Sequence, residues 1–88
     1  MTAEQQTDSA AEEVLRSYLT DRLKADVLVD QDLFASGLVN SMFAMELVVY
    51  LEKTFEVAII GEHLRLDNFR TIQSMAALVR TLRDGSDG

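Results

Sequence analysis

One serine in this chain stands where its hydroxyl could carry chemistry. Ser41 follows Gly37 and Asn40 and precedes a run of apolar residues at helical spacing that extends to Phe55. Glycine permits a sharp turn, and Asn and Ser are residue types that cap a helix start. The pattern therefore predicts a serine hydroxyl at the first turn of a helix, where the helix dipole favours negative charge.

The residue types leave two roles open for Ser41. It is either a helix cap and nothing more, or a modification site, because an attached phosphate would be stabilised at a helix start. A catalytic triad is not expected. The single histidine, His63, lies in a different segment, and no Gly-x-Ser-x-Gly sequence surrounds Ser41. A hydrolase is therefore the least supported class.

This sequence contains few residues that could bind a metal ion. The chain has no cysteine and one histidine, which is a poor donor set for zinc. A calcium-binding loop beginning at Asp30 would need glycine and glutamate at the positions that Ala35 and Ser41 occupy. We expect no metal site, and we expect His63 to lie partly exposed beside the core.

Length and composition indicate one folded domain. The chain has 88 residues, a hydrophobic fraction of 48% and a formal net charge of -7. The negative charge argues against nucleic acid and anionic membranes as partners. The first residues have no signal-peptide pattern, and no apolar run approaches the roughly 20 residues of a membrane span. A cytoplasmic, free-standing monomer is expected.

The periodicity of the apolar residues predicts an all-α fold. The expected architecture is a four-helix bundle with three main helices, one short helix and a long first loop. We expect a carrier domain at residues 10–83, between a flexible N-terminus at 1–9 and a flexible tail at 84–88. The first helix should begin at Asp8 or Ser9 and end near Lys24. After the first helix we expect a long connection at 25–40, a helix at 41–54 and a loop at 57–60. A short helical turn at 62–66, a turn at 67–70 that contains Phe69, and a last helix capped by Thr71 should follow.

The predicted helix at 41–54 is apolar on two sides. Leu47 and Leu51 are expected to face the core, whereas Met42, Met45 and Val49 form a second stripe. A domain of this size has too little interior to surround a helix, so part of that stripe should be exposed and offered to a partner. The acids that could form a rim around it are Asp26, Asp30, Asp32, Glu46, Glu52, Glu56 and Glu62.

Two stretches of the sequence are similar to the acyl carrier protein family. The first runs from Asp32 through Gly37 and Asn40-Ser41-Met42 to Glu46-Leu47, and the second is Asn68-Phe69-Arg70-Thr71-Ile72. The resemblance spans roughly residues 14–82 in the order of its segments. It implies the four-helix carrier fold, with Ser41 as the serine that receives 4′-phosphopantetheine from coenzyme A.

The resemblance also implies the partners. A phosphopantetheinyl transferase would load the arm, and acyl-loading and acyl-modifying enzymes would then use its thiol to carry an acyl group as a thioester. The expected docking surface comprises Asn40, Met42, Phe43, Met45, Glu46 and Val49. The thiol comes with the arm, so the lack of cysteine fits this role. The resemblance also implies that the carrier performs no chemistry itself and is not an enzyme.

The motif departs from the usual Asp-Ser-Leu of the family, because it reads Asn40-Ser41-Met42, and Phe43 stands where many relatives carry an acid. This variant resembles discrete carriers of polyketide pathways that hold unusual extender units, such as methoxymalonyl-acyl carrier protein. That resemblance implies a polyketide synthase acyltransferase among the partners and a role in antibiotic biosynthesis. The alternatives are a peptidyl or D-alanyl carrier protein, or an unmodified helical adaptor.

Overall fold

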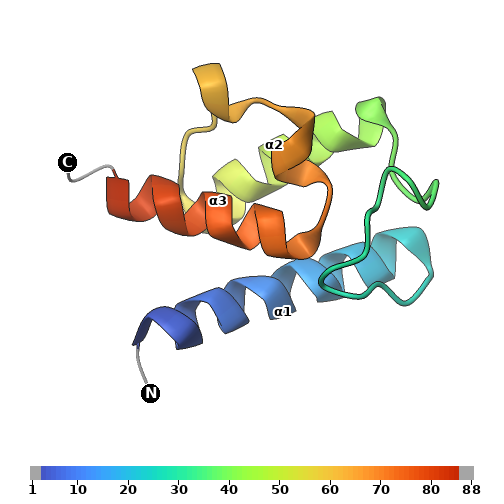
Figure 1. Ribbon diagram of the computed structural model, residues 1–88, viewed down its shortest axis with the longest axis horizontal. Helices are drawn as coiled ribbons and strands as arrows, with labels where there is room; N and C mark the ends of the chain where they lie inside the picture. Colours follow the sequence, from blue (N-terminus) through green and yellow to red (C-terminus); the bar gives the residue numbers. More distant parts are fainter. Residues whose placement is uncertain (1–2, 86–88) are drawn as a thin grey trace.

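The computed structural model describes the backbone of residues 3–85 and the side chains of residues 10–84 (Figure 1). Three α-helices dominate it, and the connection between the second and third contains two 3₁₀ helices. The elements are α1 (Ala3–Leu23), α2 (Ser41–Phe55), η1 (Gly61–His63), η2 (Leu66–Phe69) and α3 (Ile72–Gly85). No strand occurs among the described residues, so the predicted all-α carrier fold is confirmed.

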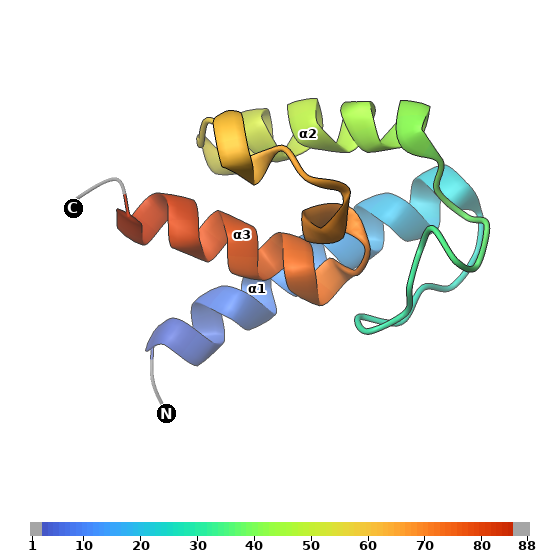
Figure 2. The ribbon, with the colours of Figure 1, turned by 45° about the horizontal axis from the view of Figure 1, so that its top comes forward.

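The three helices lie side by side (Figures 1 and 2). α2 and α3 both run roughly opposite to α1, so the end of α1 and the start of α2 lie toward the same end of the bundle. The long connection from residue 24 to residue 40 closes that same end. No helix in the described part has both the length and the hydrophobicity needed to cross a bilayer.

Local capping explains where the helices begin and end. At the end of α1, Lys24 takes a left-handed conformation with φ of 57°, and its N–H donates to the Thr20 carbonyl at 2.9 Å. Glu56 ends α2 in the same way. The hydroxyl of Thr71 accepts a hydrogen bond from the Ser74 N–H at 2.9 Å, which confirms Thr71 as the cap of α3.

Three predicted boundaries were wrong. α1 begins at Ala3, so neither Asp8 nor Ser9 starts it; the Ala, Glu and Gln residues before them favour a helix strongly enough to extend it. The short helical turn expected at 62–66 is η1 at Gly61–His63, which ends earlier than expected, and the turn expected at 67–70 is the 3₁₀ helix η2 at Leu66–Phe69. α3 continues through Asp84 to Gly85, into the expected tail. The parts of the expected flexible ends at 1–2 and 86–88 lie outside the described residues.

The core is built from all three helices and from both connections. The fully buried side chains come from α1 (Leu15, Leu19), α2 (Leu47, Leu51), α3 (Ile72, Met75, Val79) and the connections (Val27, Leu33, Ile59, Phe69). α1 packs closely along α3, whereas the backbone of α2 lies nearest to η2. α2 therefore reaches α1 chiefly through long side chains, a contact that bears on the site described next.

Candidate functional site

The turn before α2 is anchored by two buried residues, Leu33 and Val39. The Leu33 carbonyl accepts hydrogen bonds from the N–H groups of Leu38 and Val39, both at 3.1 Å. Gly37, with φ of +82°, allows the chain to reverse between them. At the start of the turn, the Asp32 carboxylate accepts hydrogen bonds from the N–H groups of residues 34 and 35 at 3.0 and 2.9 Å and so caps this turn. The turn thus holds the start of α2 in place.

The long connection is also tied to the start of α3. The Leu33 N–H donates to the Arg70 carbonyl at 2.7 Å, and the Gln73 N–H donates to the Val29 carbonyl at 3.0 Å. The Arg70 guanidinium lies 3.4 Å from the Asp32 carboxylate and 2.8 Å from that of Asp67. The hydrogen bond from Arg70 lowers the pKa of Asp67 below its ordinary value. A connection of this length is thereby held as a fixed scaffold rather than a free loop.

Ser41 is the first residue of α2, and its hydroxyl is not the helix cap. Asn40 has an extended backbone, and its side-chain oxygen accepts a hydrogen bond from the Phe43 N–H at 2.9 Å. Ser41 is exposed, and its hydroxyl makes no hydrogen bond to any residue that the structure describes. The structure therefore assigns the capping role to Asn40 and leaves the serine oxygen accessible to a partner enzyme.

The electrostatic setting of Ser41 suits an attached anion. The first intrahelical bond is donated by the Ala44 N–H, so the N–H groups of Ser41 and Met42 point out of the helix end without an intrahelical acceptor. The first turn of α2 contains no acid. The free N–H groups and the positive end of the helix dipole would stabilise a phosphodiester on the serine oxygen. The residues present thus fit a phosphate-linked group.

The second apolar stripe of α2 lies at the surface beside Ser41. The exposed fractions are 78% for Met42, 62% for Met45 and 47% for Val49, whereas Leu47 and Leu51 are fully buried. The predicted exposure of the stripe and the predicted burial of the leucines are both confirmed. The role of the stripe in binding a partner stays a prediction.

Two residues of the expected docking surface, Phe43 and Glu46, contact Arg22 at the end of α1. Arg22 donates to the Glu46 carboxylate at 2.7 Å and to the Tyr18 hydroxyl at 2.8 Å. Its guanidinium carbon lies 5.2 Å from the centre of the half-buried Phe43 ring. Tyr18 stacks on Tyr50 of α2 with ring centres 3.7 Å apart. These side chains join α1 to α2 from Phe43 as far as Tyr50.

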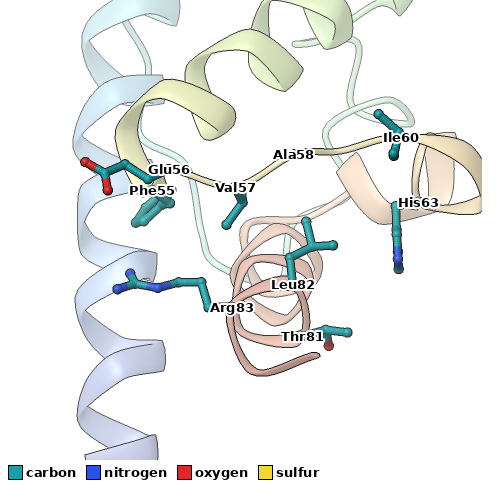
Figure 3. A pocket seen from close by; sticks show the side chains of 9 residues that line it. All are labelled: Phe55, Glu56, Val57, Ala58, Ile60, His63, Thr81, Leu82 and Arg83. Carbon is teal, nitrogen blue, oxygen red and sulfur yellow. The ribbon is translucent and has the colours of Figure 1, made fainter. Parts of the chain in front are cut away.

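One hollow of the described surface lies away from this site. It has a volume of about 600 Å³ and lies between the C-terminal ends of α2 and α3, with Val57 and Leu82 pointing toward one another (Figure 3). His63, half-buried as predicted, lines its far side. No group of three or more His, Asp or Glu side chains among the described residues is arranged to hold a metal ion.

Comparison with known proteins decides the family. The model of the family described as "Phosphopantetheine attachment site" matches residues 13–79, which is most of the chain. The chain belongs to the acyl carrier protein family. Its cofactor is accordingly 4′-phosphopantetheine, held covalently, and a carrier protein of this kind has a phosphopantetheinyl transferase and acyl-handling enzymes as partners. Carrier proteins are generally not catalysts themselves.

The curated relatives of this carrier protein include D-alanyl carrier proteins. The protein of that name from Lactococcus lactis subsp. lactis (strain IL1403) is 32% identical over 65 residues, covering 74% of this chain and 80% of that protein. The one from Lactobacillus delbrueckii subsp. bulgaricus (strain ATCC BAA-365 / Lb-18) is 27% identical over 56 residues, covering 64% of this chain and 70% of that protein.

Sequence reasoning missed one residue of the site of this carrier protein. The only feature of the sequence that could have indicated Arg22 is local: it lies four residues after Tyr18 on the same helix. Its ion pair with Glu46 crosses 24 positions of sequence. No periodicity reports a contact of that kind, because the contact depends on how two helices are packed.

Proposed function

We propose that Ser41 is the attachment serine of this carrier protein. The single observation that carries the proposal is the exposed hydroxyl of Ser41, which bonds to none of the described residues, at a helix start whose cap is supplied by Asn40. When bound, the arm supplies a thiol on which an acyl group is held as a thioester. The chain holds the arm at the rigid start of α2 and presents it to successive enzymes.

The intact mass of the protein tests this proposal. The apo protein is incubated with coenzyme A and a phosphopantetheinyl transferase, and the expected product is heavier by one phosphopantetheinyl group. Ser41→Ala should abolish the gain. Ser36→Ala is the matched control, because Ser36 is also exposed and lies in the turn before α2. A mass gain that persists in Ser41→Ala would exclude Ser41 as the attachment point.

We infer that partner enzymes dock on the α2 face beside Ser41. Met42, Met45 and Val49 form the exposed apolar part of this docking face. Asn40, Phe43 and Glu46 border it, and each is held by a contact within the domain. Methionine side chains adapt their shape readily, which suits a surface that several enzymes must grip in turn. This role is separable from folding, because the stripe is outside the core.

There are two candidates for the group that the arm carries. The Asn40-Ser41-Met42 motif followed by Phe43 resembles polyketide extender-unit carriers, which favours an acyl or extender unit delivered to a polyketide synthase acyltransferase, within antibiotic biosynthesis. The similarity to D-alanyl carrier proteins favours D-alanine instead. Incubation of the holo protein with a D-alanine-activating ligase and, separately, with an extender-loading enzyme would separate the two by mass. We expect loading by the second enzyme; exclusive loading by the ligase would overturn the polyketide assignment.

An unmodified adaptor is the remaining alternative from another class. It would use the same exposed stripe but would bind its partner equally well after Ser41→Ala. A hydrolase using Ser41 is not supported, because no described histidine accepts a hydrogen bond from its hydroxyl. A fluorophosphonate probe should therefore leave the protein unlabelled.

A further inference from the structure

Arg22 is held in place by three contacts at once. Its guanidinium donates to the Glu46 carboxylate and to the Tyr18 hydroxyl, and it lies over the Phe43 ring. The hydrogen bond to Glu46 raises the pKa of Arg22 further above its ordinary value. The Tyr18 ring is itself stacked on Tyr50. These contacts hold the charged group of Arg22 close to the Glu46 carboxylate.

Glu46 is the acid nearest to Ser41 on α2. It lies five positions after Ser41, whereas Glu52, the other acid of the helix, lies eleven positions after it, about 16 Å along the axis at 1.5 Å per residue. The Glu52 carboxylate accepts a hydrogen bond from the Ile59 N–H at 2.8 Å, near the far end of the helix. Glu46 is thus the carboxylate of α2 that a basic residue of a docking enzyme would reach first.

The Arg22 charge masks that carboxylate. With the two charged groups 2.7 Å apart, their fields largely cancel at the distance of an approaching protein. A lysine or arginine of the partner would have to displace Arg22 from Glu46, Tyr18 and Phe43 together. What remains beside Ser41 for an enzyme to grip is the apolar stripe of Met42, Met45 and Val49.

We propose that Arg22 determines which partners this carrier accepts. By neutralising Glu46, it disfavours enzymes that dock through a basic patch and favours enzymes whose matching surface is apolar. The proposal rests on the proposed attachment at Ser41 and goes beyond it by naming the chemistry of the partner surface. Arg22 acts through Glu46, so it is a positioning residue and is not expected to touch the reacting atoms.

The test uses a phosphopantetheinyl transferase chosen for a basic carrier-docking surface, with the full apo chain as substrate. Arg22→Gln unmasks Glu46 and should lower KM about fivefold at about 0.02 M NaCl, with kcat unchanged, because one new attraction at contact is worth about that factor. At about 0.3 M NaCl the difference from the wild type should shrink to less than about twofold. Arg22→Lys keeps the charge and should retain the wild-type KM.

Arg16→Gln is the matched control. It removes the same charge from the same helix, where Arg16 lies 4.0 Å from Glu13, and it leaves the Arg22–Glu46 pair intact. It should change KM by less than about twofold, since only the net charge is altered. The double variant Arg22→Gln/Glu46→Gln should lose the gain of Arg22→Gln, because the unmasked carboxylate is gone. Thermal unfolding followed by circular dichroism verifies that each variant is folded.

Three outcomes would overturn the proposal. They are an unchanged KM in Arg22→Gln at low salt, an equal fall of KM in Arg16→Gln, or an effect confined to kcat, which would mean that Arg22 positions Ser41 and does not mask a charge. A failure of the proposed attachment looks different, because the wild type would then show no mass gain that depends on Ser41.

Discussion

At the scale of single residues, Asn40 and Ser41 at the start of α2 have separate roles: one caps the helix and the other presents a hydroxyl to solvent. Asn40 accepts the Phe43 N–H and so starts the helix, whereas the Ser41 hydroxyl stays in solvent without a bond in the described structure. A serine that capped the helix would have its oxygen occupied. Because Asn40 has the capping role, a change at Ser41 can alter the function of the protein without disturbing the helix.

Asn40→Ala should therefore lower the free energy of unfolding by about 1 kcal/mol, within the range of 0.5–2 kcal/mol known for lost helix caps. Ser41→Ala should lower it by less than about 0.5 kcal/mol, the usual limit for exposed positions. Urea denaturation measures both. Asn40→Asp keeps the accepting oxygen and serves as the control. A larger loss for Ser41→Ala than for Asn40→Ala would mean that the serine is the true cap.

At the scale of the helix, α2 presents two apolar faces with different tasks. Leu47 and Leu51 are fully buried, whereas Met45 is 62% exposed on the opposite side. Burial determines the energetic value of an apolar side chain, because only the surface removed from water stabilises the fold. The leucine face therefore stabilises the domain, and the methionine face is available for contact with a partner.

Leu47→Ala should cost about 2–5 kcal/mol of unfolding free energy, as for other buried leucines, because it leaves a cavity in the core. Met45→Ala should cost less than about 1 kcal/mol, since most of the side chain is already in water. It should nevertheless raise the KM of a docking enzyme. Chemical denaturation of the two variants, alongside transferase kinetics for Met45→Ala, checks this division. Equal losses of stability would contradict it.

At the scale of the whole molecule, arginines join segments that are distant in sequence. Arg70 links the start of α3 to the long first connection through Asp32, and Arg22 links α1 to α2 through Glu46, whereas the pair of Arg70 with Asp67 is local. All of these pairs are partly exposed, so each contributes little to stability on its own. Their effect is to set how the elements that surround Ser41 are oriented.

The Arg70 pair predicts part of the acid sensitivity of the fold. Because the pKa of Asp67 is lowered in the folded state, its contribution to stability is present above about pH 4, the unfolded value, and is lost as pH falls through the lower folded value. The Tm of Asp67→Asn should therefore fall less steeply than that of the wild type between about pH 5 and pH 2.

Thermal unfolding across that range measures the slope. Glu62→Gln is the control for removing a carboxylate from the same connection, because Glu62 is exposed and makes no ion pair within the described residues. Its pH profile should remain that of the wild type. A profile of Asp67→Asn that matches the wild type would show that the pair with Arg70 does not contribute.

Local patterns predicted the features that depend on local physics. Helical spacing predicted α2 and its two faces, and Thr71 and Lys24 indicated the boundaries of α3 and α1. The start of α1 was wrong by several residues, because polar residues with high helix propensity resemble a frayed end when no apolar residue marks them. The bounds of the short helical turn expected at 62–66 were wrong, since 3₁₀ turns carry little periodicity of their own.

The sequence by itself determined the family, the all-α fold and the exposed apolar stripe, because periodicity, capping residues and a motif are properties of neighbouring positions. Only the tertiary structure decided that the Asn40 side chain caps α2 and that the Ser41 hydroxyl does not. It also decided that Glu46 is paired with Arg22, which is 24 positions away. Such pairings depend on how helices pack, and helix packing brings together residues whose spacing in the chain carries no signal.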